Sequence, residues 1–171
     1  MASCWLGPSK NKLVSGSWDQ TLLLWDVGDE KATQVQKLTG HEQRITNVDT
    51  HPREETILSA SQDATFRVWD PRKASTALSV SQAHSSALTS AIFSHVGNYV
   101  VTSSKDRTIK VWDLKYTKAP VAVIRTGANV SKISVSPFAG TIAAPLDNGD
   151  IRLFDLSGGQ IAKIGKSFPV R

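Results

Sequence analysis

The sequence has few of the residues and motifs on which most enzymes and secreted proteins depend. Among its 171 residues there is a single cysteine, Cys4, which excludes an internal disulfide and a cysteine-rich zinc site. Because such cysteine usage suits a reducing compartment, we expect a cytoplasmic and/or nuclear protein. No apolar run approaches the roughly 20 residues of a membrane-spanning helix, and the first residues do not form a signal peptide. We therefore expect no membrane insertion.

No segment carries a dense charge of one sign. The formal net charge is +5, made up of 0 for residues 1–40, −1 for 41–83, +4 for 84–127 and +2 for 128–171 (Lys and Arg minus Asp and Glu). The positive excess is spread over several predicted strands and turns, with no stacking aromatic residues between them. We interpret it as a solvated basic flank or as a surface for an acidic or phosphorylated partner. This pattern does not favour nucleic acid.

Catalytic and ligand-binding motifs are also missing. Gly158-Gly159 is not followed by the Lys-Ser/Thr of a phosphate-binding loop. His51 and His95 are expected at strand ends, facing solvent, and Cys4 is expected to be a small buried residue. No segment is predicted to be an α-helix. We therefore predict a protein that is not an enzyme and that needs no metal or cofactor.

The sequence does contain a segment that is repeated four times. Its clearest copy is Lys-Asp-Arg-Thr-Ile-Lys-Val-Trp-Asp at residues 105–113, which reads as a turn followed by a strand. The copies end at Trp25-Asp26, Trp69-Asp70, Trp112-Asp113 and Phe154-Asp155, at intervals of 44, 43 and 42 residues. A period of this length with a terminal Trp-Asp is typical of four-stranded propeller blades.

On these residues the chain resembles the WD-repeat β-propeller family. The resemblance implies an all-β fold of about four four-stranded antiparallel blades, a single partial β-propeller with blades at residues 2–39, 40–82, 83–126 and 127–166. Such propellers usually close with about seven blades, so we expect an incomplete, open ring, the C-terminal part of a propeller without its last blade. A closed four-bladed ring is the alternative. Uncovered blade faces are expected to cause self-association.

Turn residues and alternating side chains place the strands within each blade. The expected strands are 2–8, 12–17, 21–26 and 34–38; then 44–50, 56–61, 65–70 and 77–81; then 87–94, 99–104, 108–113 and 120–125; and finally 130–136, 141–144, 151–155 and 161–164. One side of every third strand is apolar and must be covered by the neighbouring blade. In the fourth blade, Asn148-Gly149 is expected to form a tight turn, because this pair tolerates a positive φ.

A Gly-His pair is the second landmark of the family. It occurs as Gly40-His41 and Ala83-His84 and fails at Gly127-Ala128. The resemblance implies a hydrogen-bond chain in each blade, from the Trp indole through a hydroxyl and the His to the turn Asp. Buried polar groups cost several kcal/mol unless they are paired, so we assign this chain a structural role. Its predicted members are Asp19 and Trp25; His41, Ser59 (or Ser61), Asp63 and Trp69; and His84, Thr102 (or Ser104), Asp106 and Trp112.

The resemblance favours a scaffold or adaptor for protein–protein interactions. Residues 124–126 and 143–158 resemble the penultimate, degraded blade of one group within the family, which implies sorting proteins of the phosphofurin acidic-cluster class as partners. The family's geometry puts four residues on one rim of the disc, and an exposed Trp beside basic residues is typical of interface hot spots. We predict that a partner binds at these residues: Trp18, Arg44, Gln62 and Lys105. Asp147 is expected on the same rim in the fourth blade, and the alternative for Trp18 is that it only packs on the next loop.

Two other functions remain open. Trp69, Asp70 and Arg72 match the Trp-Asp-x-Arg element of propellers that act as substrate receptors of cullin-RING ubiquitin ligases. The basic third blade would instead suit an RNA-associated propeller subunit. A phosphate-driven contact weakens steeply with salt, whereas an adaptor held by an apolar interface does not.

Overall fold

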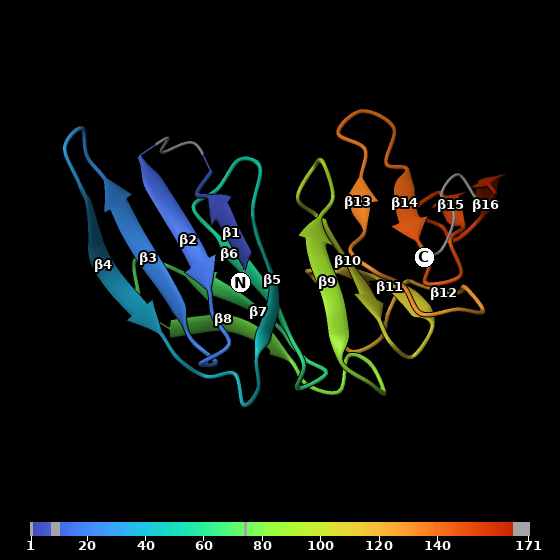
Figure 1. The fold of residues 1–171 in the computed structure, drawn as a ribbon, viewed down its shortest axis with the longest axis horizontal. Helices are drawn as coiled ribbons and strands as arrows, with labels where there is room; N and C mark the ends of the chain where they lie inside the picture. Colours follow the sequence, from blue (N-terminus) through green and yellow to red (C-terminus); the bar gives the residue numbers. More distant parts are fainter. Residues whose placement is uncertain (1, 8–10, 74, 166–171) are drawn as a thin grey trace.

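The computed structural model describes residues 2–7, 11–73 and 75–165, and these residues form four four-stranded antiparallel sheets (Figure 1). We refer to the sheets, in chain order, as blades 1 to 4. Blade 1 holds β1 (Ala2–Trp5), β2 (Lys12–Gly16), β3 (Leu22–Val27) and β4 (Ala32–Leu38); blade 2 holds β5 (Ile45–Thr50), β6 (Ile57–Ser61), β7 (Phe66–Asp70) and β8 (Ser75–Val80). Blade 3 holds β9 (Leu88–Phe93), β10 (Tyr99–Ser104), β11 (Thr108–Asp113) and β12 (Ala122–Arg125); blade 4 holds β13 (Ser134–Val135), β14 (Ile142–Pro145), β15 (Ile151–Phe154) and β16 (Gln160–Ile164).

These elements confirm the predicted all-β fold. No helix occurs among the described residues, and hence none that could cross a membrane. The blade limits given above stay a prediction, and residue 166 lies outside the described residues. The predicted strand at residues 2–8 ends earlier, at Trp5, and residue 8 is likewise outside the described part.

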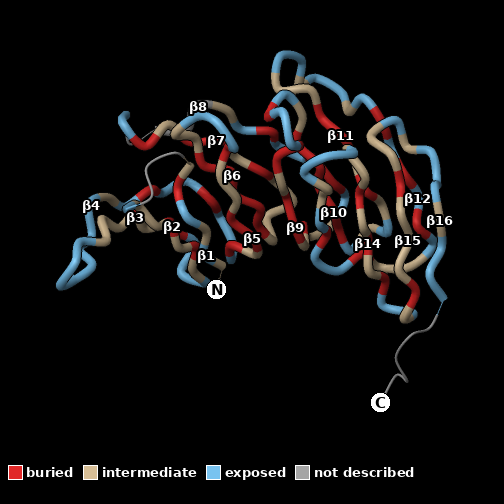
Figure 2. Tube along the Cα trace, turned by 90° about the horizontal axis from the view of Figure 1, so that it is seen from above, coloured by how far each residue is buried: buried red, intermediate tan, exposed pale blue. Residues whose placement is uncertain are grey.

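The four blades stand side by side in chain order and form an open arc (Figure 2). The first strands of neighbouring blades are in contact, β1 with β5, β5 with β9, and β9 with β13. The outer strands β4 and β16 lie at opposite ends of the arc. This arrangement agrees with the expected open ring.

Three apolar clusters fill the spaces between neighbouring blades. In each cluster the apolar side of one blade's third strand packs against the Trp or Phe that ends the next blade's third strand. Between blades 2 and 3, for example, the rings of Phe66 and Trp112 lie 5.6 Å apart. The array is therefore held together by a junction that is built in the same way three times.

The first strand of blade 4 is shorter than predicted. We expected residues 130–136, but β13 contains only Ser134 and Val135. Ser131 N–H donates to the Pro145 carbonyl at 2.9 Å, and proline has no N–H to donate back. The Ser131 carbonyl instead accepts hydrogen bonds from the hydroxyls of Thr89 and Ser103 on blade 3. Pro145 thus interrupts the ladder, and blade 3 satisfies the carbonyl that is left free.

The turn between the second and third strands has the same conformation in all four blades. The residue after the turn Asp or Asn has a positive φ: 74° at Gln20, 64° at Ala64, 66° at Arg107 and 87° at Gly149. This agrees with the turn expected at Asn148-Gly149. The other three blades adopt the left-handed conformation without glycine, which is unfavourable for a residue that carries a Cβ.

Candidate functional site

Blade 2 contains a continuous chain of hydrogen bonds from its core to its rim. The Trp69 indole N–H donates to Ser59 Oγ at 2.8 Å, and Ser59 Oγ lies 2.7 Å from His41 Nε2. His41 Nδ1 lies 2.8 Å from Asp63 Oδ2. The carboxylate can only accept, so His41 Nδ1–H is the donor; in the neutral imidazole Nε2 then accepts from the serine hydroxyl. The structure thus brings these four residues together, with Ser59 rather than Ser61 as the hydroxyl.

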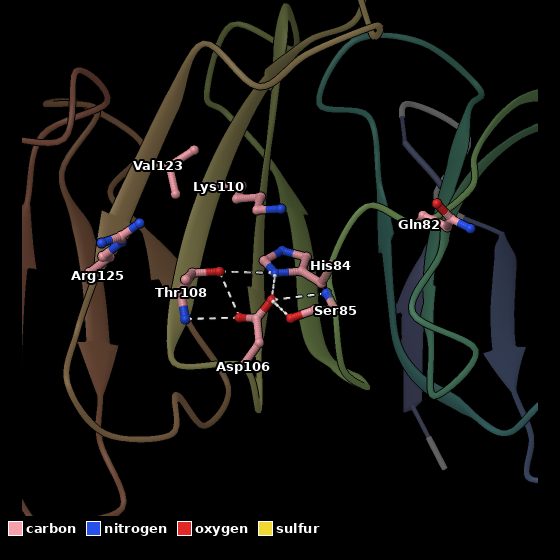
Figure 3. A pocket seen from close by; sticks show the side chains of 8 residues that line it. All are labelled: Gln82, His84, Ser85, Asp106, Thr108, Lys110, Val123 and Arg125. Carbon is pink, nitrogen blue, oxygen red and sulfur yellow. Dashed lines mark hydrogen bonds and ion pairs between the residues drawn. The ribbon is translucent and has the colours of Figure 1, made fainter.

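Blade 3 repeats this chain with a threonine in place of the serine. The Trp112 indole donates to Thr102 Oγ1 at 2.9 Å, which lies 2.8 Å from His84 Nε2, while His84 Nδ1 lies 2.8 Å from Asp106 Oδ2. Figure 3 shows His84 and Asp106 facing each other, with Thr108 and Ser85 also bonded to the carboxylate. This end of the chain opens into a cavity of about 620 Å³ whose lining includes Lys110 and Arg125.

Burial and hydrogen bonding set the charge states along these chains. Burial alone would raise the pKa of the Asp63 carboxyl, but hydrogen bonds from His41 and Thr65 outweigh it, and the pKa falls well below its usual range. For Asp106, burial is outweighed in the same way by the Thr108 hydroxyl and by His84, so its pKa is also lowered. Burial lowers the pKa of His84 against the opposing attraction of Asp106, so this histidine is held neutral.

The order hydroxyl, imidazole, carboxylate is also that of a hydrolytic triad, but the surroundings differ. Ser59 and Thr102 are fully buried, and each hydroxyl already accepts an indole N–H. An attacking oxygen must reach the substrate, and these two have no access to one. The arrangement satisfies buried polar groups, which rigidifies the blade.

Blade 1 has only part of the chain. The Trp25 indole donates to Ser15 Oγ at 2.9 Å, while Asp19 accepts from the amide and hydroxyl of Thr21. In blades 2 and 3 the His precedes the turn Asp by 22 residues, whereas no histidine precedes Asp19 in this sequence. Among the described residues no hydrogen bond links Asp19 to Trp25, so the structure does not bring these two together.

Blade 4 replaces every member of the chain. Thr126 stands in place of the His, because it precedes Asn148 by 22 residues and its N–H donates to the Arg107 carbonyl as the His84 N–H does to the Ala64 carbonyl; the expected position, Ala128, lies two residues later. Asn148 stands in place of the Asp, Phe154 in place of the Trp and Ala144 in place of the hydroxyl. Ala144 and Phe154 belong to the apolar cluster between blades 3 and 4, and Ala128 packs against it. Ala144 was not predicted from the sequence, although it precedes Phe154 by ten residues, as Ser59 precedes Trp69 and Thr102 precedes Trp112.

The four predicted rim residues lie in or beside the turns at one edge of the blades. Trp18 is 63% exposed, and the Arg44 guanidinium lies over its ring, 4.7 Å from the centroid. Gln62 N–H donates to the Arg44 carbonyl at 2.9 Å, so these three residues are neighbours across blades 1 and 2. Lys105 is exposed at the equivalent turn of blade 3, and Asp147 is exposed at that of blade 4.

The Trp-Asp-x-Arg element is divided between the core and the surface. Trp69 is buried in the blade 2 chain, and only Arg72 of the three is well exposed. The Arg72 Nε and Nη2 groups donate to the two carboxylate oxygens of Asp70, at 3.1 and 3.3 Å. The exposed part of this element is therefore a single fixed guanidinium.

Two expectations about individual side chains need correction or refinement. His51 was expected to face solvent, but it is buried, because its Nδ1 accepts the amides of Arg53 and Glu54 and its ring packs on Phe93. His95 is exposed, as expected. Cys4 is half-buried, and burial raises the pKa of its thiol. In the described part of the chain, no three His, Cys, Asp or Glu side chains gather as metal ligands would.

Four antiparallel blades joined by repeated tryptophan junctions define an array of β-propeller blades. The model of the family described as "WD domain, G-beta repeat" matches residues 2–26, 32–70 and 75–113, more than half of the sequence. The chain belongs to the WD-repeat family.

Among curated proteins, the chain is similar to WD repeat-containing protein 37. It is 45% identical to that protein from Xenopus laevis and 44% identical to that from Homo sapiens, in both cases over 168 residues, which are 98% of this chain and 33% of the relative. It is also 36% identical to pre-mRNA-processing factor 19 from Bos taurus, over 54% of this chain and 18% of that protein. The chain thus spans about a third of the length of the first two relatives.

Proposed function

We propose that this chain is a non-enzymatic scaffold whose rim binds an acidic or phosphorylated protein segment. WD-repeat domains generally bind other proteins, and this supports the scaffold function in general terms. The observation that carries the more specific proposal is the exposed Trp18 ring covered by the Arg44 guanidinium. A large aromatic surface beside a fixed cation is typical of an interface hot spot.

The charges along the rim support an anionic partner. Arg44 and Lys105 each present a positive charge near one edge of blades 2 and 3, and the Gln62 backbone N–H donates to the Arg44 carbonyl. A carboxylate or phosphate could pair with either cation without the cost of full burial, because both side chains are exposed. Sorting proteins of the phosphofurin acidic-cluster class are the first partners to test, and we place the interaction in the cytoplasm or nucleus.

The test compares matched substitutions on opposite edges of the blades. Trp18→Ala is paired with Phe138→Ala, because Phe138 is 93% exposed in the β13–β14 loop at the other edge. Lys105→Glu is paired with Lys118→Glu, which makes the same charge change in the β11–β12 loop. Lys163 would not serve as a control, because it forms an ion pair with Asp150 at 3.0 Å.

The measurement is the affinity for an acidic-cluster peptide, with and without phosphoserine, at two salt concentrations. Trp18→Ala is expected to weaken binding by about tenfold or more, and Lys105→Glu by less, while both control variants bind like the wild type. Equal losses for the Phe138 and Trp18 variants would show that the rim is not the binding surface.

The two alternative functions predict different results in the same assay. Similarity to pre-mRNA-processing factor 19 and the basic third blade favour the RNA-associated alternative, which predicts capture of single-stranded RNA that is lost at high salt. The exposed Arg72 favours the ligase-adaptor alternative, which predicts capture of a cullin adaptor that survives high salt but not Arg72→Ala.

A further inference from the structure

A groove crosses the first strands of blades 2, 3 and 4 near the loops in which these strands end. Its volume is about 280 Å³, and its lining comes from β5, from β9 and from the residues around β13. The β5–β6, β9–β10 and β13–β14 loops stand along the same edge of the array, the upper edge in Figure 1. Arg44 directly precedes β5, so the predicted rim lies at the opposite edge.

Most of the lining of this groove is apolar. Five of the lining residues are aliphatic or proline: Pro52, Ile92, Ile133, Val135 and Pro137. Two large apolar side chains stand in the adjoining loops, Val96, which is 49% exposed, and Phe138, which is 93% exposed. Exposed apolar residues that border a groove are typical of a surface that binds a protein.

One carboxylate lies within this apolar lining. Asp49 is half-buried near the end of β5 and lines the groove. Its Oδ2 accepts the backbone N–H of Phe93 on β9 at 2.8 Å, and its Oδ1 lies 3.9 Å from Cys4 Sγ. An ionised carboxylate can accept about four hydrogen bonds, so Asp49 has capacity for further donors.

The carboxylate is particular to blade 2. Strand pairing places Cys4, Ile92 and Ser134 at the corresponding positions of blades 1, 3 and 4. A neutral amide oxygen could accept the Phe93 N–H as well as a carboxylate does. The architecture of the blade therefore does not explain the negative charge.

Asp49 also lacks a paired cation. Within the described part of the chain, none of the ion pairs involves it, and the exposed Lys132 attracts it only from a longer distance. Burial raises the pKa of the Asp49 carboxyl, and the hydrogen bond from the Phe93 amide opposes this rise. A buried charge costs free energy until an opposite charge pairs with it, so a cationic ligand would remove this cost.

We propose that the groove binds an arginine side chain of a partner protein, with the guanidinium group on the Asp49 carboxylate. A guanidinium group is weakly hydrated and donates two parallel hydrogen bonds to a carboxylate, so it suits a half-buried pair better than the ammonium group of lysine. The aliphatic part of the arginine lies against Ile92 and Val135, and Phe138 borders the partner residues beside it. This site takes the opposite charge from the rim and lies at the other edge, so it does not depend on the function proposed above.

The test is a titration of the full ¹⁵N-labelled chain with the peptide Ac-Ala-Ala-Arg-Ala-Ala-NH2, followed by NMR. The matched peptide contains citrulline, which has nearly the same shape as arginine but no charge. The Phe93 amide is the reporter, because it donates to Asp49. The arginine peptide is expected to shift this signal in a saturable manner, and the citrulline peptide is not. The net charge of +5 opposes non-specific binding of a basic peptide.

Two substitutions test the role of the groove. Asp49→Asn removes the charge but keeps an acceptor for the Phe93 N–H, and it is expected to weaken binding by at least about tenfold. Asp29→Asn makes the same charge change in the exposed β3–β4 loop and is expected to bind like the wild type. Ser134→Arg places a competing guanidinium group at an exposed position of the lining, so it is expected to prevent binding of the peptide while Asp49 is intact.

The second substitution provides the test if circular dichroism shows that Asp49→Asn is unfolded. Equal affinity for the arginine and citrulline peptides would overturn the proposal. Unchanged binding by the folded Asp49→Asn or Ser134→Arg variant would also do so, as would binding that leaves the Phe93 signal in place.

Discussion

Blades 3 and 4 have the same architecture but are stabilised in different ways. Blade 3 contains the four-residue chain from Trp112 to Asp106, in which every buried polar group has a partner. Blade 4 has Thr126, Ala144, Asn148 and Phe154 at the same four positions, without an imidazole, a carboxylate or an indole, and still forms four antiparallel strands. The hydrogen-bond chain is therefore not needed to build a blade.

The comparison also indicates why the four positions change together. Removing one partner from a buried network leaves the others unsatisfied, which costs about 1–3 kcal/mol for each group. Replacing all of the partners leaves nothing unsatisfied and adds apolar contacts. Ala144 and Phe154 accordingly pack with the apolar residues between blades 3 and 4, and the Thr126 hydroxyl is satisfied by the carbonyls of Arg107 and Ala128. A partly replaced chain would be less stable than either blade.

The largest effect that follows from this comparison is at the turn Asp. Asp63→Ala and Asp106→Ala are each expected to lower the free energy of unfolding by roughly 2–4 kcal/mol, because each leaves a buried His without its acceptor. Asn148→Ala is expected to cost less than about 1 kcal/mol, since within the described part of the chain the Asn148 side chain bonds only to Asp150 in its own turn. Equal losses at all three positions in denaturant unfolding would contradict the assignment of the chains.

Much of this structure could be predicted from the sequence, because the pattern repeats. The period of the Trp-Asp pairs indicates the four blades, and alternation along each third strand indicates which residues meet the next blade. The missing histidine and the substitution at Phe154 likewise indicate that blade 4 lacks the chain, although the sequence placed the lost histidine at Ala128 and the structure places it at Thr126.

Other features depend on contacts that the repeat pattern of the sequence does not predict. The shortening of β13 follows from the missing N–H of Pro145 together with two hydroxyls from blade 3. The burial of His51 depends on two loop amides that its Nδ1 accepts. The stacking of Arg44 on Trp18 joins two blades, and the sequence placed both residues on one rim without predicting their contact.

Lowering the pH is expected to have an intermediate effect on the free energy of unfolding, through protonation of His84. Burial lowers the pKa of His84 in the folded protein below the value of about 6.5 that it has in the unfolded chain. At a pH between these two pKa values, the unfolded chain therefore binds one more proton than the folded protein. The free energy of unfolding therefore falls as the pH falls below 6.5, by at most about 1.4 kcal/mol per pH unit for this one group. The lowered pKa values of Asp63 and Asp106 add acid sensitivity only below their ordinary range.

The measurement is the change in unfolding free energy between pH 7.5 and pH 5 for the wild type and for His84→Asn. The variant is expected to be less stable at both pH values but to lose less stability between them. Burial raises the pKa of Asp49, which acts in the opposite direction, but this contribution is common to both proteins and cancels in the comparison. Equal pH dependence of the two proteins would show that His84 does not carry the effect.

The smallest effect is expected at the left-handed turn residue, where blade 4 again differs from the others. Gly149→Ala is expected to cost about 1 kcal/mol, because it places a Cβ on a backbone with φ of 87°. Ala64→Gly relieves the same strain at φ of 64° but increases the freedom of the unfolded chain, so the net change is expected to lie within about 1 kcal/mol of zero. Denaturant unfolding under identical conditions measures both. If Ala64→Gly destabilised the protein as much as Gly149→Ala, the positive φ of Ala64 would cost no free energy in the folded protein. The Asp63 hydrogen bonds alone would then stabilise the turn of blade 2.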